Sequence, residues 1–419
     1  MKLRALWVAV FVALAVIAPA AAAPLTSDSI TGAPAALRGK GDFWRDRIDA
    51  IVGDRPVGVA VSDGGKLLYR HSANAPRIPA SNEKLLMSMA LLSHLDPDEG
   101  LVTAVVTDAS IDEVIDGNIW LFGTGDPTVT GGGRYGRALP FTPTRLGRLA
   151  RRIKSAGITR IAGSVIGSTS YFEHDWFAPG WKSDFPSEEI PLPSALTFEG
   201  NVADGKHVQN PEERAAAALT KRLEKIGVKV GRAPAAGPLP EGPLGVAAAV
   251  RSQPLEVLLT YANRWSSNFF AEVLGKRLAV ETGREPGTIS GGAAAIEAFA
   301  SALGVDLDAN DASGLSYSNR VSAAGIVILL SSAEETTWGT SLRRSLAGAG
   351  QGTLENRLGG VRVKAKTGTL DEISALSGYV WLEKTESWAE FSILSGGLPK
   401  YTAVDIEDRI VRTLARFAY

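Results

Sequence analysis

The chain has 419 residues, enough for two or three domains, and its 45% hydrophobic and 21% charged residues are the balance of a folded globular protein. Lysine and arginine number 44 against 45 aspartates and glutamates, so a formal net charge of −1 offers no basic footprint for nucleic acid or for an anionic membrane. Cysteine is absent, which excludes disulfide scaffolds, cysteine zinc sites, cysteine nucleophiles and anchoring through a lipidated cysteine.

The first 23 residues are typical of a secretory signal peptide. Lys2 and Arg4 precede an apolar run over residues 5–18, which is too short to cross a hydrocarbon core of about 30 Å as a helix. Pro19 ends this run, and the small residues 20–23 offer an A-x-A cleavage site. We therefore expect residues 1–23 to be removed and the chain to be exported to the periplasm or the extracellular cell-wall space, with no transmembrane anchor afterwards. An uncleaved N-terminal anchor is the alternative.

Residues 56–71 and 81–92 predict a hairpin followed by a buried helix. Two apolar runs flank the turn residues Asp63, Gly64 and Gly65, which is typical of a β-hairpin. Ser81 then precedes the apolar stretch 85–92, and serine is favoured at the start of a helix. Because that stretch is apolar on almost every side, we expect the helix to be buried.

The texture of the sequence changes between residues 97 and 250. Short strand-like runs at 101–106, 118–122 and 161–168 alternate with glycine- and proline-rich turns, and one amphipathic helix is predicted near 144–156. The proline-rich stretch 232–245 is predicted to be a linker. We therefore expect residues 97–249 to form an inserted, mostly β domain.

The last part of the chain predicts helices first and strands afterwards. The expected helices are 254–263, 269–281, 292–303 and 322–333; the expected strands are 361–366, 374–383 and 388–395; a final helix is expected at 404–418. Residues 24–96 and 250–419 are thus predicted to form one α/β (α+β) domain, an antiparallel sheet covered by helices, on either side of the insertion.

The chain has little histidine with which to build a catalytic or metal site. It contains four histidines, and none accompanies a serine in a G-x-S-x-G sequence, so a Ser-His-Asp triad lacks support. No H-x-x-x-H or H-E-x-x-H spacing is present, and we predict no metal site and no cofactor.

A serine–lysine pair is the alternative that the sequence offers. Residues 81–84 (SNEK) form the only S-x-x-K of the chain. At the start of a helix, residues i and i+3 share one face, so Lys84 can reach Ser81 Oγ. Burial lowers the proton affinity of a lysine, which lets the neutral amine act as a base. Taken alone, such a short pattern is also typical of an ordinary helix start.

Two further patterns give the pair its context. Residues 366–368 form the only K-T-G, predicted to end the strand 361–365, and glycine there lets another backbone or a substrate approach. The Lys366 ammonium and the hydroxyls of Thr367 and Thr369 suit a substrate carboxylate. S-x-N occurs at 72–74, in a plain turn, and at 266–268, between two predicted helices where capping is the ordinary role. The order S-x-x-K, S-x-N, K-T-G, each in its required context, favours function over chance.

At these residues the sequence resembles the penicillin-recognising serine acyl-transferases, which include the D-alanyl-D-alanine peptidases and the serine β-lactamases. The 185 residues from Ser81 to Ser266 exceed the β-lactamase spacing, and the insertion accounts for the excess. Residues 79–86 (PASNEKLL), 123–128 (GTGDPT) and 311–316 (DASGLS) are similar to those of D-alanyl-D-alanine carboxypeptidase/endopeptidases of the class-C low-molecular-mass penicillin-binding protein type. The resemblance runs from about residue 45 to the C-terminus.

The resemblance implies a role for each matching position. Ser81 would be the acylated nucleophile, Lys84 its base, and Ser266 the proton relay to the leaving amine. The substrate-binding residues would be Asn268, which would bind a substrate amide, Lys366, which would support the proton network and the carboxylate, and Thr367, Gly368 and Thr369 of the K-T-G strand. The backbone N–H groups of Ser81 and Thr369 would form the oxyanion hole.

The resemblance departs from the family pattern at two places. Thr369 stands where the family often has serine, which keeps the hydroxyl. The Gly-Asp pair expected before Tyr-Phe is Gly167-Ser168 here, followed by Tyr171-Phe172 after two more residues. No substrate contact is therefore carried over to that aspartate position.

The expected protein is a hydrolase with a penicillin-binding/β-lactamase-like fold. It would cleave the terminal D-Ala-D-Ala bond of peptidoglycan stem peptides through a serine acyl-enzyme, with endopeptidase activity on crosslinks as a further expectation, and β-lactams would inhibit it covalently. One rival is a β-lactamase or esterase on the same scaffold, yet no glutamate here has the asparagine four residues on that a class A β-lactamase uses. The other rival, an idle wall-binding protein, is disfavoured by the intact motifs.

Overall fold

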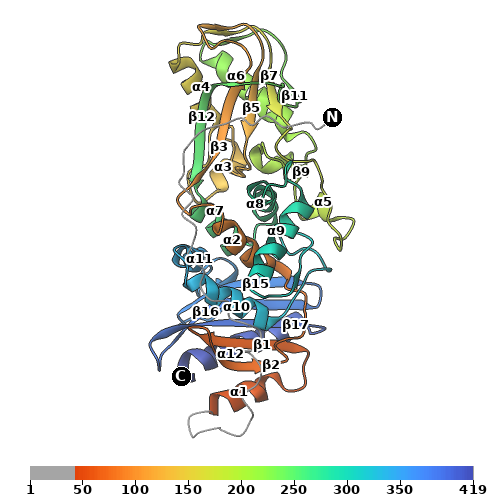
Figure 1. The fold of residues 1–419 in the computed structure, drawn as a ribbon, viewed down its shortest axis with the longest axis vertical. Helices are drawn as coiled ribbons and strands as arrows, with labels where there is room; N and C mark the ends of the chain where they lie inside the picture. Colours follow the sequence, from red (N-terminus) through yellow and green to blue (C-terminus); the bar gives the residue numbers. More distant parts are fainter. Residues whose placement is uncertain (1–42, 419) are drawn as a thin grey trace. The chain divides into compact units, whose positions relative to one another are not determined.

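The structure is a computed structural model that describes residues 43–418. The predicted signal peptide lies outside the described residues. The described chain forms two compact units. The larger unit contains residues 43–100, 174–193 and 254–418, and the smaller unit contains residues 101–173 and 194–253 (Figure 1).

The larger unit is built on one five-stranded antiparallel sheet. Its strand order is β15-β16-β17-β1-β2, which places the last three strands of the chain beside the first hairpin. The strands are β1 (Val57–Asp63), β2 (Lys66–His71), β15 (Val363–Leu370), β16 (Ile373–Leu382) and β17 (Ser387–Gly396). The predicted hairpin and all three predicted C-terminal strands are therefore present.

Alternation along the strands divides the residues between two helical layers. In β1, the valines 57, 59 and 61 enter a core with α1 (Phe43–Val52) and α12 (Lys400–Phe417). The next residue, Ser62, faces the opposite layer, where its hydroxyl lies 3.0 Å from Ser331 Oγ of α10. Figure 1 shows α1 and α12 on one side of the sheet and α10 on the other.

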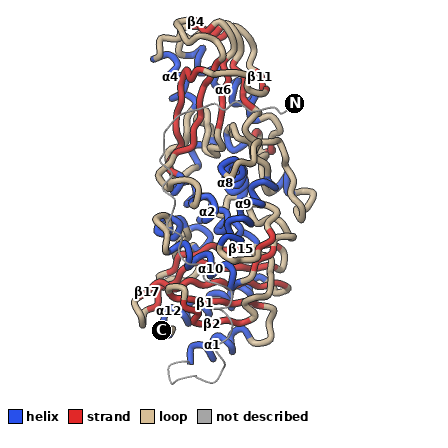
Figure 2. The backbone as a smooth tube through the Cα atoms, viewed as in Figure 1, coloured by secondary structure: helices blue, strands red, loops and turns tan. Residues whose placement is uncertain are grey.

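The second layer surrounds a helix that is buried along its whole length. Every residue of α2 (Glu83–Leu92) is buried, as its apolar sequence predicts. Helices contact α2 on several sides, and Figure 2 shows them gathered on one side of the larger unit's sheet. They are α7 (Leu255–Arg264), α8 (Asn268–Glu281), α9 (Ile289–Ala302), α10 (Ala323–Glu334) and α11 (Gly339–Ser345).

The smaller unit, which contains most of the predicted insertion, has two sheets and also helices. Its five-stranded sheet has the order β11-β7-β5-β3-β12, in which β5 and β7 run parallel, and a second, three-stranded sheet β10-β6-β4 is wholly parallel. The strands are β3 (Gly100–Thr107), β4 (Val114–Ile115), β5 (Ile119–Gly123), β6 (Arg160–Ile161), β7 (Val165–Ser168), β10 (Lys229–Val230), β11 (Ala235–Gly237) and β12 (Gly245–Pro254). Two helices, the predicted α4 (Leu146–Ser155) and the unpredicted α6 (Pro211–Lys225), pack on each other and into the core of this unit.

The predicted linker 232–245 is wrong in part. Residues 235–237 form β11, which pairs in parallel with β7, and β12 begins at Gly245. Prolines 234 and 238 stand directly outside β11, so they end this short edge strand rather than prevent it.

The boundary of the predicted insertion also differs from the observed units. Residues 174–193, placed by the sequence in the insertion 97–249, belong to the larger unit. Trp181, Phe185 and Ile190 of this segment pack with Ile289 and Leu315 in one apolar cluster. We call residues 174–193 the strap. That the remainder of the insertion folds as a domain by itself stays a prediction.

Candidate active site

The turn that carries Ser81 is compact and strained. Pro79 precedes a 3-10 turn, Ala80–Asn82, which runs directly into α2. Ala80 has φ of +47°, in the left-handed region that a non-glycine residue rarely occupies. Ser81 remains partly accessible, whereas Asn82 and Lys84 are buried. The turn therefore presents one hydroxyl at the end of a buried helix, and such strain is often concentrated at functional sites.

Lys84 lies at the centre of the site. Its Nζ is 3.1 Å from Ser81 Oγ, so the predicted i, i+3 contact is present. The same Nζ donates to Asn268 Oδ1 at 2.8 Å and to the carbonyl oxygen of Ser313 at 2.5 Å. One amine thus joins three segments that are far apart in the sequence.

A second wall of the site comes from the connection between α7 and α8. Ser266 stands in this connection with φ of +54°, and Ser267 caps α8 by accepting a hydrogen bond from Phe270 N. Asn268 is the first residue of α8, which places its side chain beside Lys84. Ser267, the middle residue of this S-x-N, therefore caps the helix, whereas Ser266 and Asn268 face the site.

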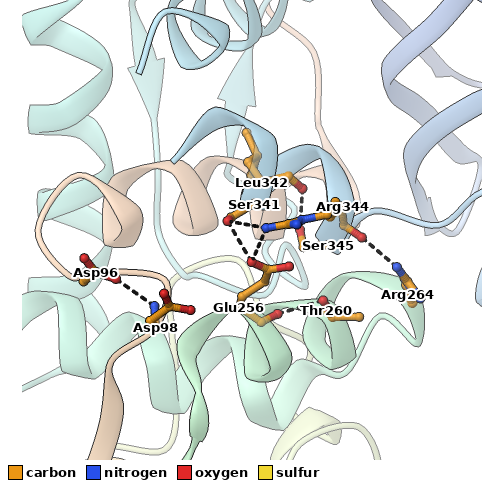
Figure 3. A network of polar contacts seen from close by, with 9 residues as sticks. All are labelled: Asp96, Asp98, Glu256, Thr260, Arg264, Ser341, Leu342, Arg344 and Ser345. Atoms are coloured by element: carbon orange, nitrogen blue, oxygen red, sulfur yellow. Dashed lines mark hydrogen bonds and ion pairs between the residues drawn. The ribbon is translucent and has the colours of Figure 1, made fainter. Parts of the chain in front are cut away.

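Polar contacts between α7 and α11 hold the end of α7 (Figure 3). Glu256 Oε2 accepts hydrogen bonds from Ser341 Oγ at 2.7 Å and from the Arg344 guanidinium at 2.9 Å. At the other end of α7, Arg264 donates to the carbonyl oxygen of Arg344 at 2.6 Å. Ser266 follows Arg264 by two residues, so this network holds the helix end from which the chain continues to Ser266.

The third wall is the edge strand β15. Lys366 Nζ donates to Ser266 Oγ at 2.9 Å and to its neighbour's carbonyl, Thr367 O, at 2.7 Å. A Cβ on Gly368 would lie 2.7 Å from the carbonyl oxygen of Pro79, so only glycine lets β15 approach the Ser81 turn this closely. The K-T-G was predicted to follow a strand; it lies inside β15, which continues to Leu370 because β16 pairs with it along its whole length.

Both lysines of the site are completely buried, and this changes their acidity. Burial lowers the pKa of Lys84 to about 8, against the opposing effect of nearby carboxyl groups. Burial, and then the charge of Lys84, lower the pKa of Lys366 well below its usual value. An amine that loses its proton near neutral pH can accept one from a serine hydroxyl, so the pair Ser81–Lys84 is equipped for nucleophilic catalysis.

Three buried acidic residues that the sequence analysis did not assign surround Lys84. Asp311 accepts five hydrogen bonds, from the side chains of Trp181, Ser313 and Asn319 and from the backbone N–H groups of Gly314 and Ser316. Burial raises the pKa of Glu272 to about 8 and the pKa of Glu83 well above its ordinary value. Among the described residues, neither oxygen of Glu83 has a hydrogen-bond partner, which is consistent with a neutral carboxyl.

The strap contacts the start of α8, the loop that contains Asp311 and the turn that follows β15. The carbonyl oxygen of Glu189 accepts a hydrogen bond from Asn268 Nδ2 at 3.4 Å. Trp181 Nε1 donates to Asp311 Oδ2 at 2.7 Å, and Lys182 forms an ion pair with Asp371, in the turn that follows β15, at 2.5 Å. No periodic pattern marks this segment; its aromatic residues were the only available signal.

One cation beside the K-T-G strand was also missed. Lys400, the first residue of α12, donates a hydrogen bond to Thr369 Oγ1. Within residues 43–418, Lys400 has no carboxylate in ion-pair distance. In the same described part of the chain, the hydroxyl of Thr367, two residues before Thr369 on β15, has no hydrogen-bond partner. Two hydroxyls and an ammonium are the groups that a carboxylate requires.

In the described part of the chain, no group of three or more metal-ligating side chains is placed to hold an ion. No described helix is both long enough and apolar enough to cross a membrane.

The predicted site residues thus come together around Lys84 and β15. Ser81, Lys84 and Asn268 share direct hydrogen bonds, Lys366 joins Ser266, and 367–369 continue the same edge strand. The arrangement provides an accessible hydroxyl, an amine base with a lowered pKa, and a second serine–lysine pair. These are the groups needed for acyl transfer through a serine ester.

Comparison with known proteins agrees with this chemistry. The family model described as D-Ala-D-Ala carboxypeptidase 3 (S13) matches residues 47–206 and 202–417. A D-alanyl-D-alanine carboxypeptidase of Actinomadura sp. (strain R39) is 28% identical, over 89% of this chain and 85% of the relative.

Two solved structures show the same fold. The crystal structure of penicillin binding protein 4 from Haemophilus influenzae has a TM-score of 0.73 at 20% identity, covering 88% of this chain and 99% of that chain. The structure of the same protein in complex with a β-lactam has a TM-score of 0.68 at 20% identity, covering 89% of this chain and 100% of that chain. The predicted fold, helices on an antiparallel sheet in the penicillin-binding class, is confirmed.

Proposed function

The chain belongs to the D-Ala-D-Ala carboxypeptidase 3 (S13) family of serine peptidases, and we propose that Ser81 is the nucleophile with which it forms an acyl-enzyme on peptidoglycan stem peptides. The observation that carries the proposal is the contact of Ser81 Oγ with a fully buried lysine amine whose pKa is lowered to about 8. Such an amine is neutral in a useful fraction of molecules near neutral pH, which an exposed lysine is not.

In the acylation step, Ser81 Oγ attacks the carbonyl carbon of the penultimate D-alanine. The Ser81 proton passes to Lys84 Nζ as the C–O bond forms, and the backbone N–H groups of Ser81 and Thr369 stabilise the oxyanion. The C–N bond then breaks, and the terminal D-alanine leaves with a proton delivered through Ser266, whose hydroxyl is held by Lys366 at 2.9 Å. In the second step, a water molecule hydrolyses the ester and returns the proton to Ser81.

The K-T-G strand and α12 would bind the carboxylate of the terminal D-alanine. Thr367 and Thr369 offer hydroxyl donors. Lys400 adds a positively charged ammonium group that is hydrogen-bonded to Thr369 Oγ1. Lys400 is only partly desolvated, so its contribution is a moderate one. Asn268, whose Oδ1 is occupied by Lys84, would still offer Nδ2 to the substrate amide in place of its long contact with Glu189 O.

A β-lactam would acylate the same serine, because its ring amide takes the position of the D-Ala-D-Ala bond. Hydrolysis of crosslinks that contain a D-amino acid would use the same groups with a larger leaving amine. Export through residues 1–23 would place the enzyme beside its substrate; N-terminal sequencing of the mature protein from an export-competent host tests the cleavage.

Replacement of the nucleophile tests the proposal. Ser81→Ala is expected to lower hydrolysis of a D-Ala-D-Ala peptide by at least roughly 10³-fold while the fold is retained. The control is Ser72→Ala, in the other S-x-N, which lies in an exposed turn and leaves activity unchanged. Mass spectrometry of digested muropeptides would identify the bond cleaved. Activity of Ser81→Ala near that of the unchanged protein would refute the serine mechanism.

A fluorescent penicillin separates a peptidase from a β-lactamase. The expected result is one adduct per chain, on Ser81, that survives for minutes or longer, because no glutamate of this chain has the class A β-lactamase pattern for activating the deacylating water. Rapid turnover of benzylpenicillin with no trapped adduct would favour the β-lactamase.

A further inference from the structure

The direction in which Lys84 offers its lone pair depends on two oxygen acceptors. A neutral amine has two N–H bonds and one lone pair. Asn268 Oδ1 at 2.8 Å and Ser313 O at 2.5 Å take the two N–H bonds, so the lone pair is left for Ser81 Oγ at 3.1 Å. If either acceptor moved away, an N–H bond could turn towards Ser81 instead, and the amine would donate to the nucleophile rather than accept its proton.

Ser313 O is a backbone atom, so its position depends on what holds its loop. Glu272 Oε1 accepts hydrogen bonds from the backbone N–H of Ala312 at 2.9 Å and of Ser313 at 2.7 Å. Glu272 is completely buried, and it lies one helical turn after Asn268 on α8. One face of α8 therefore supplies the first acceptor for Lys84 directly and fixes the second acceptor through the loop.

The loop has no freedom to compensate on its other side. Gly314 adopts φ of +79°, and a Cβ there would lie 1.9 Å from the carbonyl oxygen of Ala80, so the loop is pressed against the Ser81 turn. Asp311 binds the N–H groups of Gly314 and Ser316 and closes the loop from within. Glu272 provides the attachment of this loop to α8.

We propose that Glu272 is a positioning residue for the base of this enzyme: by binding the N–H groups of Ala312 and Ser313, it holds the Ser313 carbonyl on Lys84 and so aims the amine lone pair at Ser81. The inference rests on the proposed function, because it assumes that Lys84 accepts the Ser81 proton. Glu272 itself touches no reacting atom.

The charge of Glu272 has a separate effect that a test can resolve. The charged groups that face Lys84 are Glu83, Glu272 and Asp311, which raise its pKa, and Lys366, whose pKa is coupled to that of Lys84. Glutamine keeps an oxygen acceptor for the two N–H groups and removes the ionisable carboxyl. Leucine removes both, at similar volume.

The test measures acylation of the full chain by a fluorescent penicillin as a function of pH, from about pH 6 to about pH 10. Glu272→Gln is expected to keep the maximal acylation rate within about threefold and to move the rise of the rate to lower pH by roughly half a unit, because one charge that raises the pKa of Lys84 is lost. Glu272→Leu is expected to lower the maximal rate about 10²-fold, the scale of general-base catalysis.

Glu281→Gln is the matched control. Glu281 lies on the same helix and forms an ion pair with Arg277, away from Lys84, so its replacement should leave rate and pH profile unchanged. Thermal unfolding of each variant checks that the protein is folded.

The outcomes separate positioning from simple structural support. A folded Glu272→Leu protein that is acylated at the unchanged rate would overturn the inference. A folded Glu272→Gln protein that loses the acylation rate as Glu272→Leu does would also overturn it, because glutamine keeps an oxygen acceptor for the two N–H groups. Should Glu272→Leu not fold, Glu272→Gln decides, since a folded glutamine variant whose rate falls about 10²-fold contradicts the role. Because the unchanged protein must first show its adduct on Ser81, failure of the proposed function is seen separately.

Discussion

Burial of Lys84 should make the protein less stable than it would be with an apolar residue at this position, and the deficit should vanish at high pH. The pKa of Lys84 falls from 10.5 to about 8 in the folded protein, and each pH unit corresponds to about 1.4 kcal/mol. Keeping a proton on this buried amine therefore costs the folded state about 3 kcal/mol below pH 8. Between about pH 8 and pH 10.5 the unfolded chain binds more protons than the folded one, so stability rises with pH and the cost disappears.

Lys84→Met removes this cost and also three hydrogen bonds. Asn268 Oδ1 and Ser313 O then lose a donor, at about 1 kcal/mol each. At pH 7 the variant is thus expected to be as stable as the unchanged protein or about 1 kcal/mol more stable, although it is inactive. Near pH 10.5 it should be less stable by about 2 kcal/mol.

The decisive quantity is how the difference in free energy of unfolding between the Lys84→Met variant and the unchanged protein changes with pH. The contributions of the other titrating groups largely cancel in this difference. Urea denaturation of both proteins at pH 7 and at about pH 10 measures it. Lys384→Met, at an exposed turn, serves as control and should show no such change. A difference in stability that stays constant over this pH range would mean that the pKa of Lys84 is not lowered, and the neutral-amine mechanism would fail with it.

Three other substitutions test the surroundings of the site. Lys400→Met should raise KM roughly two- to fivefold for a D-Ala-D-Ala peptide with a free carboxylate and leave KM for the C-terminal amide unchanged, whereas equal effects on both substrates would exclude a contact with the carboxylate. Gly368→Ala should slow acylation by penicillin at least about tenfold, because its Cβ would meet Pro79 O at 2.7 Å, while Gly359→Ala, whose Cβ meets nothing within 4 Å, is its control; equal rates for the two would contradict the close approach. Asp311→Ala leaves five buried donors unpaired and should lower the thermal unfolding temperature by many degrees; a shift of only a degree or two would mean that the loop repairs itself.

Local rules were sufficient for the parts of the site that lie on regular elements. The i, i+3 spacing of Ser81 and Lys84 placed both on one face of a helix start, and the structure has them in contact. Alternating or continuous apolar residues predicted β1, β16 and β17 because each strand has at least one face in a core. Gly368 was predicted to permit a close approach, and its neighbour proves to be the Ser81 turn itself.

Contacts between distant loops could not be predicted in this way. The strap has no helical or strand period, and its aromatic residues find partners on α9 and in the loop near Leu315, more than 100 residues away. Glu272 and Asp311 occupy positions where a sequence alone suggests solvent-exposed charges, since acidic residues are rarely buried. Helix α6 was missed because the surrounding short strands and prolines dominated the pattern, although Pro211 at its first turn is typical of a helix start.

The buried acids set how basic the amine of Lys84 remains. Burial alone lowers its pKa, and the charges of Asp311, Glu272 and Glu83 raise it, which leaves a value of about 8. A lysine with burial and no carboxylates would lose its proton too readily to hold the one it takes from a serine. The acids therefore oppose the effect of burial on the base, and burial in turn raises the pKa of Glu83 and of Glu272, so each of these carboxyl groups contributes its charge only as it ionises.

In the proposed mechanism, the second lysine would determine where the proton goes. The pKa of Lys366 is lowered by burial and by the charge of Lys84, so the two amines compete for protons, and a proton on one makes a proton on the other less favourable. In the proposed acylation, Lys84 would accept the Ser81 proton, which would increase the positive charge around the two buried amines. Transfer of a proton onward to the leaving amine would relieve that repulsion, and Ser266, held 2.9 Å from Lys366 Nζ, is the hydroxyl that we propose carries it. The proposed mechanism would thus give the proton a direction through two buried lysines, one beside the proposed nucleophile Ser81 and one beside the proposed relay Ser266.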